Sequence, residues 1–345
     1  MMESIQTTLA AWQAALLALA AAGLLTPLMR AYSLRHGLVD QPGARRSHSV
    51  PIARGGGLAI GISIVLTSLL FSPYNLILGP FVAGSVIISL LGWRDDHAPL
   101  AIRWRLGVQT MAALGAVALL GPVESIRVAG IAVSAAWLWS SMAVIAIVWL
   151  MNLFNFMDGS DGLASSQAAL SLVLFAVAFS LGGQPEATWL AAVSAGAALG
   201  FLFWNWPRAS IFLGDSGSLL LGWCVGCLAL VGASTDSVSI WSAFIIVSPF
   251  VTDATATLCW RLARRERWYT PHADHAYQYL IRVGWSHRKV LLAWILMNGL
   301  LVVPATAVVL WKPQIDMIVA AVLAAVLLGV WYVVHFVVAK ERVTT

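Results

Sequence analysis

Eleven apolar runs, each about long enough to cross a lipid bilayer as a helix, follow one another along this chain of 345 residues. A helix that spans a bilayer needs about 20 mostly apolar residues. Hydrophobic residues make up 60% of the chain and charged residues only 10%, whereas a soluble domain carries about 25% charged residues. We therefore predict an all-α polytopic integral membrane protein of about 11 transmembrane helices, forming one membrane-embedded domain over 1–345. The predicted spans are 8–29, 55–72, 76–92, 106–121, 133–151, 163–182, 187–204, 217–233, 238–259, 290–310 and 315–338.

The first run has no basic segment before it and no clear small-residue cleavage site after it, so we interpret it as a span rather than a signal peptide. Cys224 and Cys227 form a C-x-x-C pair inside a predicted span. With no βαβ pattern around the pair, packing is the favoured interpretation over redox or zinc chemistry.

Basic residues are biased to one side of the predicted helices. With each connection numbered by the helix that it follows, the odd connections hold all but two of the 20 Lys and Arg residues, and only Arg127 and Lys312 lie in even ones. Because an excess of Lys and Arg marks the cytoplasmic side, we expect a periplasmic N-terminus and a cytoplasmic C-terminus. The net charge of +5 then indicates membrane and phosphate chemistry and not nucleic-acid binding.

The same odd connections, near 30–54, 93–105, 151–163, 205–217 and 260–289, carry most of the polar chemistry. Even connections contain a few acids, without glycine–acid motifs. Acids, arginines and histidines gathered at one membrane face suit a magnesium ion and a diphosphate. The acids on the odd side are Asp95, Asp96, Asp158, Asp161, Asp215 and Asp274.

The connection at 151–163 is the most informative. Asp158 and Asp161 are each followed by glycine, which permits a tight backbone path. Two acids three residues apart, beside Asn155, can converge on one cation or polar ligand. An ordinary Asp/Gly turn between two helices is the alternative.

Three further features each have two interpretations. The stretch after Arg54 is Gly-Gly-Gly, which suits either a phosphate at a helix entry or close helix packing. The adjacent acids Asp95 and Asp96 are either a solvated pair or a site pair in which repulsion raises one pKa. Asp215 is flanked by glycines at a predicted helix start. It is either a ligand of a metal–phosphate complex or an N-cap.

The connection at 260–289 begins with arginines spaced as on one helix face, which predicts an amphipathic segment on the cytoplasmic leaflet. His272 and His275 follow, and a zinc site is disfavoured because no Cys or third His lies close. Phosphate contact is the better functional interpretation. We interpret His287 as structural or interfacial. Asp253 lies within a predicted span, must face the bundle interior, and is expected to position a basic loop residue.

Taken together, these loops resemble those of the polyprenyl-phosphate N-acetylhexosamine-1-phosphate transferases, and the resemblance runs from Asp40 to about Lys289. The matching motifs are Asp40-Gln-Pro…Arg46-Ser-His48…Arg54-Gly-Gly, Gly92…Asp95-Asp96, Asn152-x-x-Asn155-Phe-Met-Asp158-Gly-Ser-Asp161-Gly-Leu-Ala and Phe212-Leu-Gly214-Asp215-Ser-Gly217-Ser218.

The resemblance implies transfer of a sugar 1-phosphate from a UDP-N-acetyl amino sugar to undecaprenyl phosphate, with release of UMP, in the bacterial inner membrane and on its cytoplasmic face. It implies that Asp215 and Asn155 hold Mg²⁺, for which Mn²⁺ is a candidate substitute. Asp95 is then the candidate base or phosphate-positioning acid, with Asp96 beside it. A homodimer is a candidate assembly. Residues implied at the nucleotide or the phosphates are Asp158, Asp161, His272, His275, Arg54, His48 and Arg105.

The histidine pattern of the last connection matches neither the three consecutive histidines of the muramoyl-pentapeptide branch nor the His-x-His-His of the N-acetylglucosamine branch. It is more similar to the branch that initiates O-antigen or capsule-type glycans. We therefore predict a UDP-N-acetyl amino sugar as substrate, and among these a 6-deoxy sugar against an apolar lining such as Tyr277.

Two other classes remain as alternatives. A transporter needs acids deep in its spans at paired positions. Only Asp253 lies deep within a predicted span. A CDP-alcohol phosphotransferase has Asp-Gly-x-x-Ala followed by Arg, whereas this chain has Asp161-Gly-Leu-Ala followed by Ser165.

Overall fold

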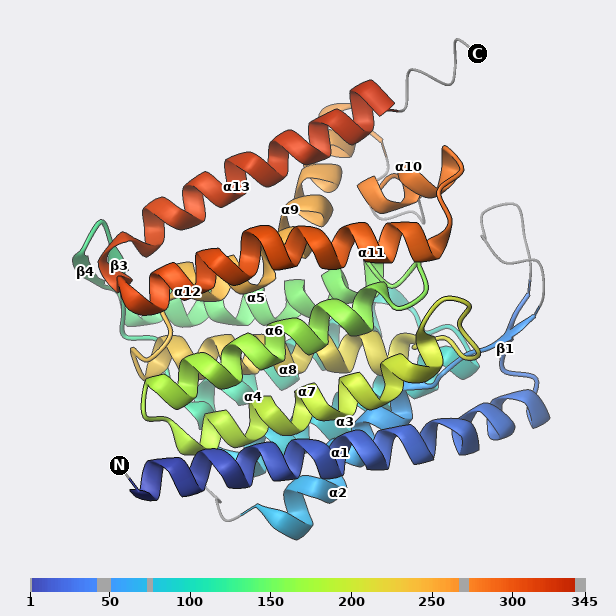
Figure 1. Cartoon of the computed structure of the whole chain (residues 1–345), viewed down its shortest axis with the longest axis horizontal. Helices are drawn as coiled ribbons and strands as arrows, with labels where there is room; N and C mark the ends of the chain where they lie inside the picture. The colour runs from blue at the N-terminus through green and yellow to red at the C-terminus, as the bar shows by residue number, and fades with distance from the viewer. Residues whose placement is uncertain (1, 42–50, 73–76, 267–272, 339–345) are drawn as a thin grey trace.

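The computed structural model describes residues 2–41, 51–72, 77–266 and 273–338, with the side chains of 2–8 and 338 left aside, as a bundle of long helices (Figure 1). Each predicted apolar run coincides with a helix for most of its length. The helices are α1 (Met2–Arg35), α2 (Gly57–Phe71), α3 (Leu78–His97), α4 (Ile102–Leu120), α5 (Ala136–Phe156), α6 (Leu163–Leu181), α7 (Pro185–Asn205), α8 (Asp215–Ser234), α9 (Ile240–Ala263), α10 (Ala276–Arg282), α11 (His287–Met297), α12 (Val303–Trp311) and α13 (Asp316–Val333). Short helical turns of other types are η1 (Asn298–Val302), η2 (Pro313–Ile315) and η3 (Val334–Val338).

Eight helical stretches of the described residues are long and apolar enough to cross a membrane, which confirms a multi-pass membrane protein. The helix α2 is a shorter apolar helix. The predicted number of eleven spans therefore stays a prediction. The eight stretches are Leu9–Arg35, Ala136–Phe156, Leu163–Leu181, Pro185–Asn205, Asp215–Ser234, Ile240–Ala263, His287–Trp311 and Pro313–Val337.

Helix α8 lies inside the bundle, and glycines let other helices approach its backbone. A Cβ atom added at Gly57 of α2 would overlap the backbone of Gly217, and one at Gly92 of α3 would overlap the carbonyl of Asp215. Added at Gly222, it would meet the backbone of α5. The glycines after Arg54 thus include one used for close helix packing, and these approaches fix where the start of α8 lies.

Two small hairpins depart from the all-α prediction. Strands β1 (Val39–Asp40) and β2 (Ile52–Ala53) pair antiparallel, as do β3 (Ser125–Val128) and β4 (Ile131–Ser134). The run predicted to span from 133 therefore begins in a strand, and α5 begins at Ala136. The two-residue turn Ala129–Gly130, in which both residues have positive φ, reverses the chain tightly enough for the β3–β4 hairpin.

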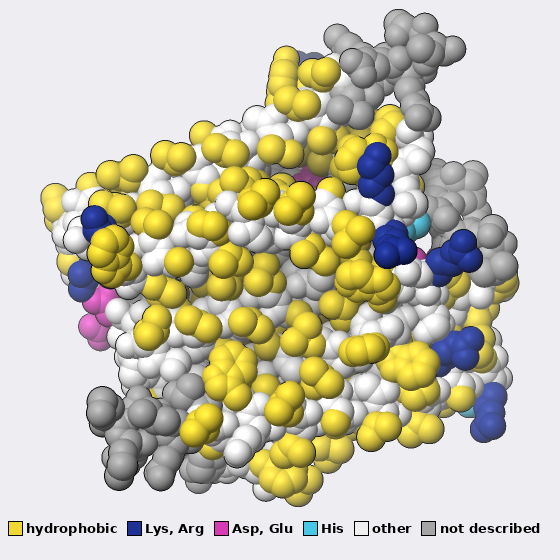
Figure 2. Space-filling view, viewed as in Figure 1, with side chains coloured by type: hydrophobic (Ala, Val, Ile, Leu, Met, Phe, Trp, Pro, Cys, Tyr) yellow, Lys and Arg dark blue, Asp and Glu magenta, His cyan; other side chains and the backbone are white. Residues whose placement is uncertain are grey.

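The odd connections gather at one end of the bundle. Figure 1 shows β1, α10 and the start of α11 at the end opposite to the β3–β4 hairpin, and α1 begins at the hairpin end. In Figure 2, hydrophobic side chains cover the flank of the bundle. Most of the visible Lys and Arg side chains lie toward the end that holds β1 and α10. The sequence bias of charge is thus a bias between the two ends of the folded molecule.

Candidate functional site

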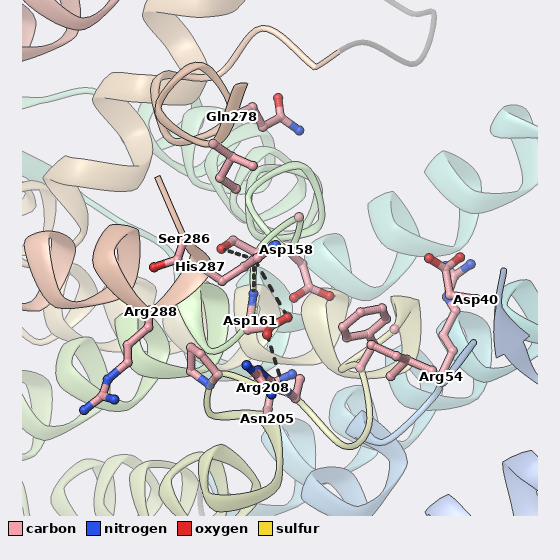
Figure 3. Close-up of a pocket in the computed structure, with 18 of the residues that line it drawn as sticks. Asp40, Arg54, Asp158, Asp161, Asn205, Arg208, Gln278, Ser286, His287 and Arg288 are labelled. Carbon is pink, nitrogen blue, oxygen red and sulfur yellow. Dashed lines mark hydrogen bonds and ion pairs between the residues drawn. The ribbon is translucent and has the colours of Figure 1, made fainter. Parts of the chain in front are cut away.

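A cavity of about 1140 Å³ opens at the end where the odd connections meet. Its walls come from the segments before α2, between α5 and α6, between α7 and α8, and around α10 and α11 (Figure 3). Of the predicted site residues, those that line it are Arg54, Asn155, Asp158, Asp161 and Asp215.

Asp215, the first residue of α8, is the most highly coordinated acid of this cavity. Its Oδ1 accepts hydrogen bonds from Asn155 Nδ2 at 2.8 Å and from Arg54 Nη2 at 2.9 Å. Its Oδ2 lies 3.7 Å from Arg105 Nη1. The positive φ of Gly214 (74°), which suits glycine, turns the chain into α8 at this point. Asp215 is therefore held in place by three segments that are distant in sequence.

Asp96, predicted as a catalytic residue, does not line the cavity. Its carboxylate accepts the backbone N–H groups of Asp215 at 2.9 Å and Ser216 at 3.1 Å, and it pairs with Arg54 Nε at 2.9 Å. The side chain is 1% exposed. Asp96 thus caps the start of α8 from a neighbouring helix, where unpaired N–H groups favour a carboxylate.

Asp95 also lies beneath the cavity wall. Its carboxylate pairs with Arg105 Nη1 at 2.7 Å and accepts the backbone N–H of Leu100. Arg105, predicted to touch substrate, joins this acid to Asp215 and to Asn155, whose Oδ1 lies 3.3 Å from Arg105 Nη2. Neither Asp95 nor Arg105 lines the cavity. Their geometry is that of groups that orient Asp215 and Asn155.

Arg54 and Asp158 show how charge is distributed here. Desolvation lowers the pKa of Arg54, but the carboxylates of Asp96 and Asp215 outweigh it and raise that pKa overall, so the guanidinium stays charged. Desolvation raises the pKa of Asp158 well above its usual range, Arg54 opposes this, and Asp215 adds to it. Around Asp215, the carboxyl groups of Asp95, Asp96, Asp158 and Asp215 outnumber the guanidinium groups of Arg54 and Arg105. A further cation here would favour the ionised form of these carboxyl groups.

The side chains fit Mg²⁺ better than a metal held by protein alone. Among the described residues, no group of three or more His, Cys, Asp and Glu can hold an ion. Mg²⁺ characteristically uses one or two carboxylates and completes its shell with water and substrate phosphates. Asp215 fits that description. Asn155, predicted as a second ligand, donates to Asp215 and to Ser218 (3.0 Å) through Nδ2, so it orients the acid.

The loop between α5 and α6 is fastened to the loop between α7 and α8. Asp161 Oδ2 accepts the backbone N–H of Ala209 at 3.1 Å. Asn205 Oδ1 accepts the N–H of Gly162 at 3.0 Å and the Ser165 hydroxyl at 3.0 Å. Gly162 has a positive φ of 72°, which suits glycine. The Asp/Gly motif is therefore both a turn and one wall of the cavity.

The last connection differs most from its prediction. His275 is buried in contact with the ring of Tyr277 and does not line the cavity. Asp253 of α9 is buried, which confirms that it faces inward, and it accepts the backbone N–H of Ala276 at 3.0 Å. Asp274 pairs with Arg261 and Arg282, away from the cavity.

Two details of that connection are corrections. Arg261, predicted to face the leaflet, is buried and bonded to Asp274. Tyr277, predicted to line a sugar pocket, is 0% exposed and donates its hydroxyl to the carbonyl of Phe156 at 3.2 Å. The predictions for His48 and His272 lie outside the described residues.

His287, interpreted from sequence as structural or interfacial, lines the cavity together with Arg208 and Arg288. Figure 3 shows His287 beside Asp161, with Arg208 below Asp161 and Arg288 to the left. Their position in odd connections was the only signal in the sequence, since no motif contains them.

Comparison with known proteins identifies the family of this chain. A model of the family described as glycosyl transferase family 4 matches residues 78–233. The chain is 31% identical to a probable undecaprenyl-phosphate N-acetylglucosaminyl 1-phosphate transferase of Bacillus subtilis, over 78% of this chain and 76% of the relative. It is 31% identical to a decaprenyl-phosphate N-acetylglucosaminephosphotransferase of Mycolicibacterium smegmatis, over 84% of this chain and 79% of the relative. Similarity to a phospho-N-acetylmuramoyl-pentapeptide-transferase of Chlamydia muridarum is 33% over 57% of this chain and 66% of the relative.

Proposed function

Since this chain belongs to the family of polyprenyl-phosphate N-acetylhexosamine-1-phosphate transferases, we propose that it transfers an N-acetylhexosamine 1-phosphate from a UDP-sugar to undecaprenyl phosphate and releases UMP. The observation that carries the proposal is Asp215, fixed by Arg54 and Asn155 in a cavity with an excess of acids. The cavity volume of about 1140 Å³ is ample for a nucleotide sugar, since ligand pockets commonly measure about 300–1,000 Å³.

In this proposal an oxygen of the lipid phosphate attacks the β-phosphorus of the UDP-sugar, and the bond from that phosphorus to the UMP oxygen breaks. Mg²⁺ at Asp215 would supply charge neutralisation on the diphosphate. Arg54 lines the cavity beside Asp215, so its guanidinium can stabilise charge that develops on the phosphates. Asp96 and Asn155 keep Asp215 in position before substrate arrives.

No protein base is required in this scheme. A phosphate monoester is already largely ionised near neutral pH. Asp95, the candidate base, is occupied by Arg105 and the N–H of Leu100. We therefore assign Asp95 to the positioning of Arg105 rather than to proton transfer.

For the sugar, we propose an N-acetyl amino sugar of the N-acetylglucosamine type, with the lipid-linked product starting an envelope glycan such as an O-antigen. Support for the sugar comes from the names of the Bacillus subtilis and Mycolicibacterium smegmatis relatives. The argument for a 6-deoxy sugar required Tyr277 to line the pocket, and Tyr277 is buried. The cavity would face the cytoplasm, where UDP-sugars are made.

The test is UMP release by the purified, detergent-extracted protein. Reactions would contain UDP-N-acetylglucosamine or UDP-muramoyl-pentapeptide, with undecaprenyl phosphate and Mg²⁺, and controls would omit the lipid or add EDTA. We expect UMP and a sugar–diphosphate lipid, by mass spectrometry, only when lipid and Mg²⁺ are both present. No UMP from any UDP-sugar would leave transport as the better explanation, and CMP release from a CDP-alcohol would favour the other alternative. A preference for the muramoyl substrate would overturn only the choice of sugar.

A further inference from the structure

His287 is the first residue of α11 and is held by a fixed set of contacts. Ser286 caps this helix, its side chain accepting the backbone N–H of Lys289. On the ring, Nδ1 lies 2.9 Å from the Ser160 hydroxyl and accepts the backbone N–H of Asp161 at 3.3 Å. A histidine ring on a helix start is thus attached to the loop between α5 and α6, which forms another wall of the cavity.

These contacts determine the tautomer of His287. A backbone N–H can only donate, so Nδ1 must act as an acceptor when Asp161 N–H points at it. Nδ1 then carries no proton, and the neutral ring has its single N–H at Nε2. Among the described residues, every hydrogen bond to this ring ends at Nδ1.

The other edge of the ring is available to a ligand. The His287 side chain is 20% exposed and lines the cavity, with Arg208 and Arg288 also in the wall. The carboxylate of Asp161 does not engage the ring by hydrogen bonding, since Oδ1 is 3.9 Å from Nδ1 and Oδ2 accepts the N–H of Ala209. His287 is therefore an oriented, neutral donor and not one half of a tight ion pair.

We propose that His287 donates a hydrogen bond through Nε2 to an oxygen of the nucleotide part of the bound nucleotide sugar, and that Ser160 and the Asp161 amide orient the ring. This rests on the proposed function above. A nucleoside monophosphate offers many acceptor oxygens, and a neutral donor in the cavity wall that also contains Arg208 and Arg288 suits them without adding charge. His287 lies far in sequence from the motifs that carry the family resemblance, the last of which ends at Ser218. It reaches the cavity because it is the first residue of α11.

The experiment compares His287→Gln, His287→Asn and His287→Ala with His36→Gln as the matched control, since His36 is exposed and lies outside the cavity lining. Glutamine can place an amide donor where Nε2 lies, whereas asparagine places it nearer Nδ1. The purified proteins would be assayed for kcat and KM with UDP-N-acetylglucosamine and for inhibition by UMP.

We expect the Asn and Ala variants to raise both KM and the UMP inhibition constant about 5- to 10-fold, as loss of one hydrogen bond predicts. The Gln variant should remain within about 3-fold of wild type. The kcat values should change less than KM, because a contact to the nucleotide serves binding. Ser160→Ala should give a smaller rise, since the Asp161 N–H remains.

Equal effects of Gln and Asn, an unchanged KM, or a rise in KM without a rise in the UMP inhibition constant would each overturn the nucleotide contact. The last result would place the contact on the sugar. If the wild-type protein turns over normally and only the variants fail these expectations, the inference alone is wrong. A wild-type protein that neither releases nor binds UMP removes the proposed function and this inference with it.

Discussion

The carboxylate of Asp96 in α3 closes the N-terminus of α8 by accepting the backbone N–H of Asp215 at 2.9 Å. The same carboxylate accepts the N–H of Ser216 and pairs with Arg54. One buried acid thus positions the neighbouring acid that lines the cavity. Asp96 is buried, whereas Asp215 lines the cavity. We therefore expect different effects from variants of the two acids.

Asp96→Ala should destabilise the protein as well as inactivate it. The change leaves the N–H groups of Asp215 and Ser216 without their acceptor and removes one of the two carboxylates paired with Arg54. Breaking a buried pair of this kind costs about 3–5 kcal/mol. We expect the melting temperature in detergent to fall by roughly 5 °C or more. Asp96→Asn, which keeps an acceptor oxygen, should recover part of the loss. A melting temperature equal to that of wild type in Asp96→Ala would show that the cap contributes nothing.

Asp215→Asn should leave the fold intact and abolish turnover. The amide keeps the shape of the side chain but cannot neutralise a metal ion as a carboxylate does. The measurements are UMP release and size-exclusion profile. A variant that keeps more than about a tenth of the wild-type rate, equivalent to a loss below ~1.4 kcal/mol, would exclude Asp215 as the metal ligand.

Gly92→Ala should impair activity although Gly92 does not line the cavity. Its Cβ would overlap the Asp215 carbonyl, so α8 must shift and carry the Asp215 side chain away from Arg54. We expect UMP release to fall more than about 10-fold, because misplacing a catalytic group by about 1 Å can cost about 100-fold. Gly107→Ala in α4 is the matched control, as its Cβ meets nothing within 4 Å, and it should behave as wild type. Normal activity in Gly92→Ala would show that α8 can move without consequence.

Asp158→Asn should stabilise the ligand-free protein at higher pH. Desolvation raises the folded-state pKa of Asp158 above its unfolded value, so the ionised form costs stability. That cost is absent below the unfolded pKa of about 3.9 and grows as pH rises through the folded pKa. The melting-temperature advantage of the variant over wild type, measured in EDTA, should therefore be larger at pH 8 than at pH 5. An advantage that is constant over this range contradicts a raised pKa.

The cavity end of the bundle should face the cytoplasm. In a Cys259→Ala background, which removes the exposed native cysteine, Arg103→Cys at the cavity end should resist a membrane-impermeant thiol reagent added to intact cells. Glu124→Cys, near the β3–β4 hairpin, should react. The reverse labelling pattern would invert the orientation predicted from the 18 basic residues on one side.

By itself, the sequence determined the helical membrane class, the approximate position of each helix and the end of the bundle that carries the chemistry. Apolar runs and charge bias are local properties, and each run reports its own environment without reference to its neighbours. The Asp158–Gly162 motif and Asp215 were identifiable because both lie in connections on the side that carries the basic residues.

Only the tertiary structure decided which polar groups meet. Asp95 and Asp96 are adjacent in sequence, yet α3 directs one to Arg105 and the other to the start of α8. His275 and Tyr277 lie within the loop that the family resemblance emphasises but are buried, whereas His287, outside its motifs, reaches the cavity. Burial and partner choice depend on close helix approaches such as that of Gly57 to Gly217. Those approaches join residues far apart in the chain, and no local pattern encodes the pairing.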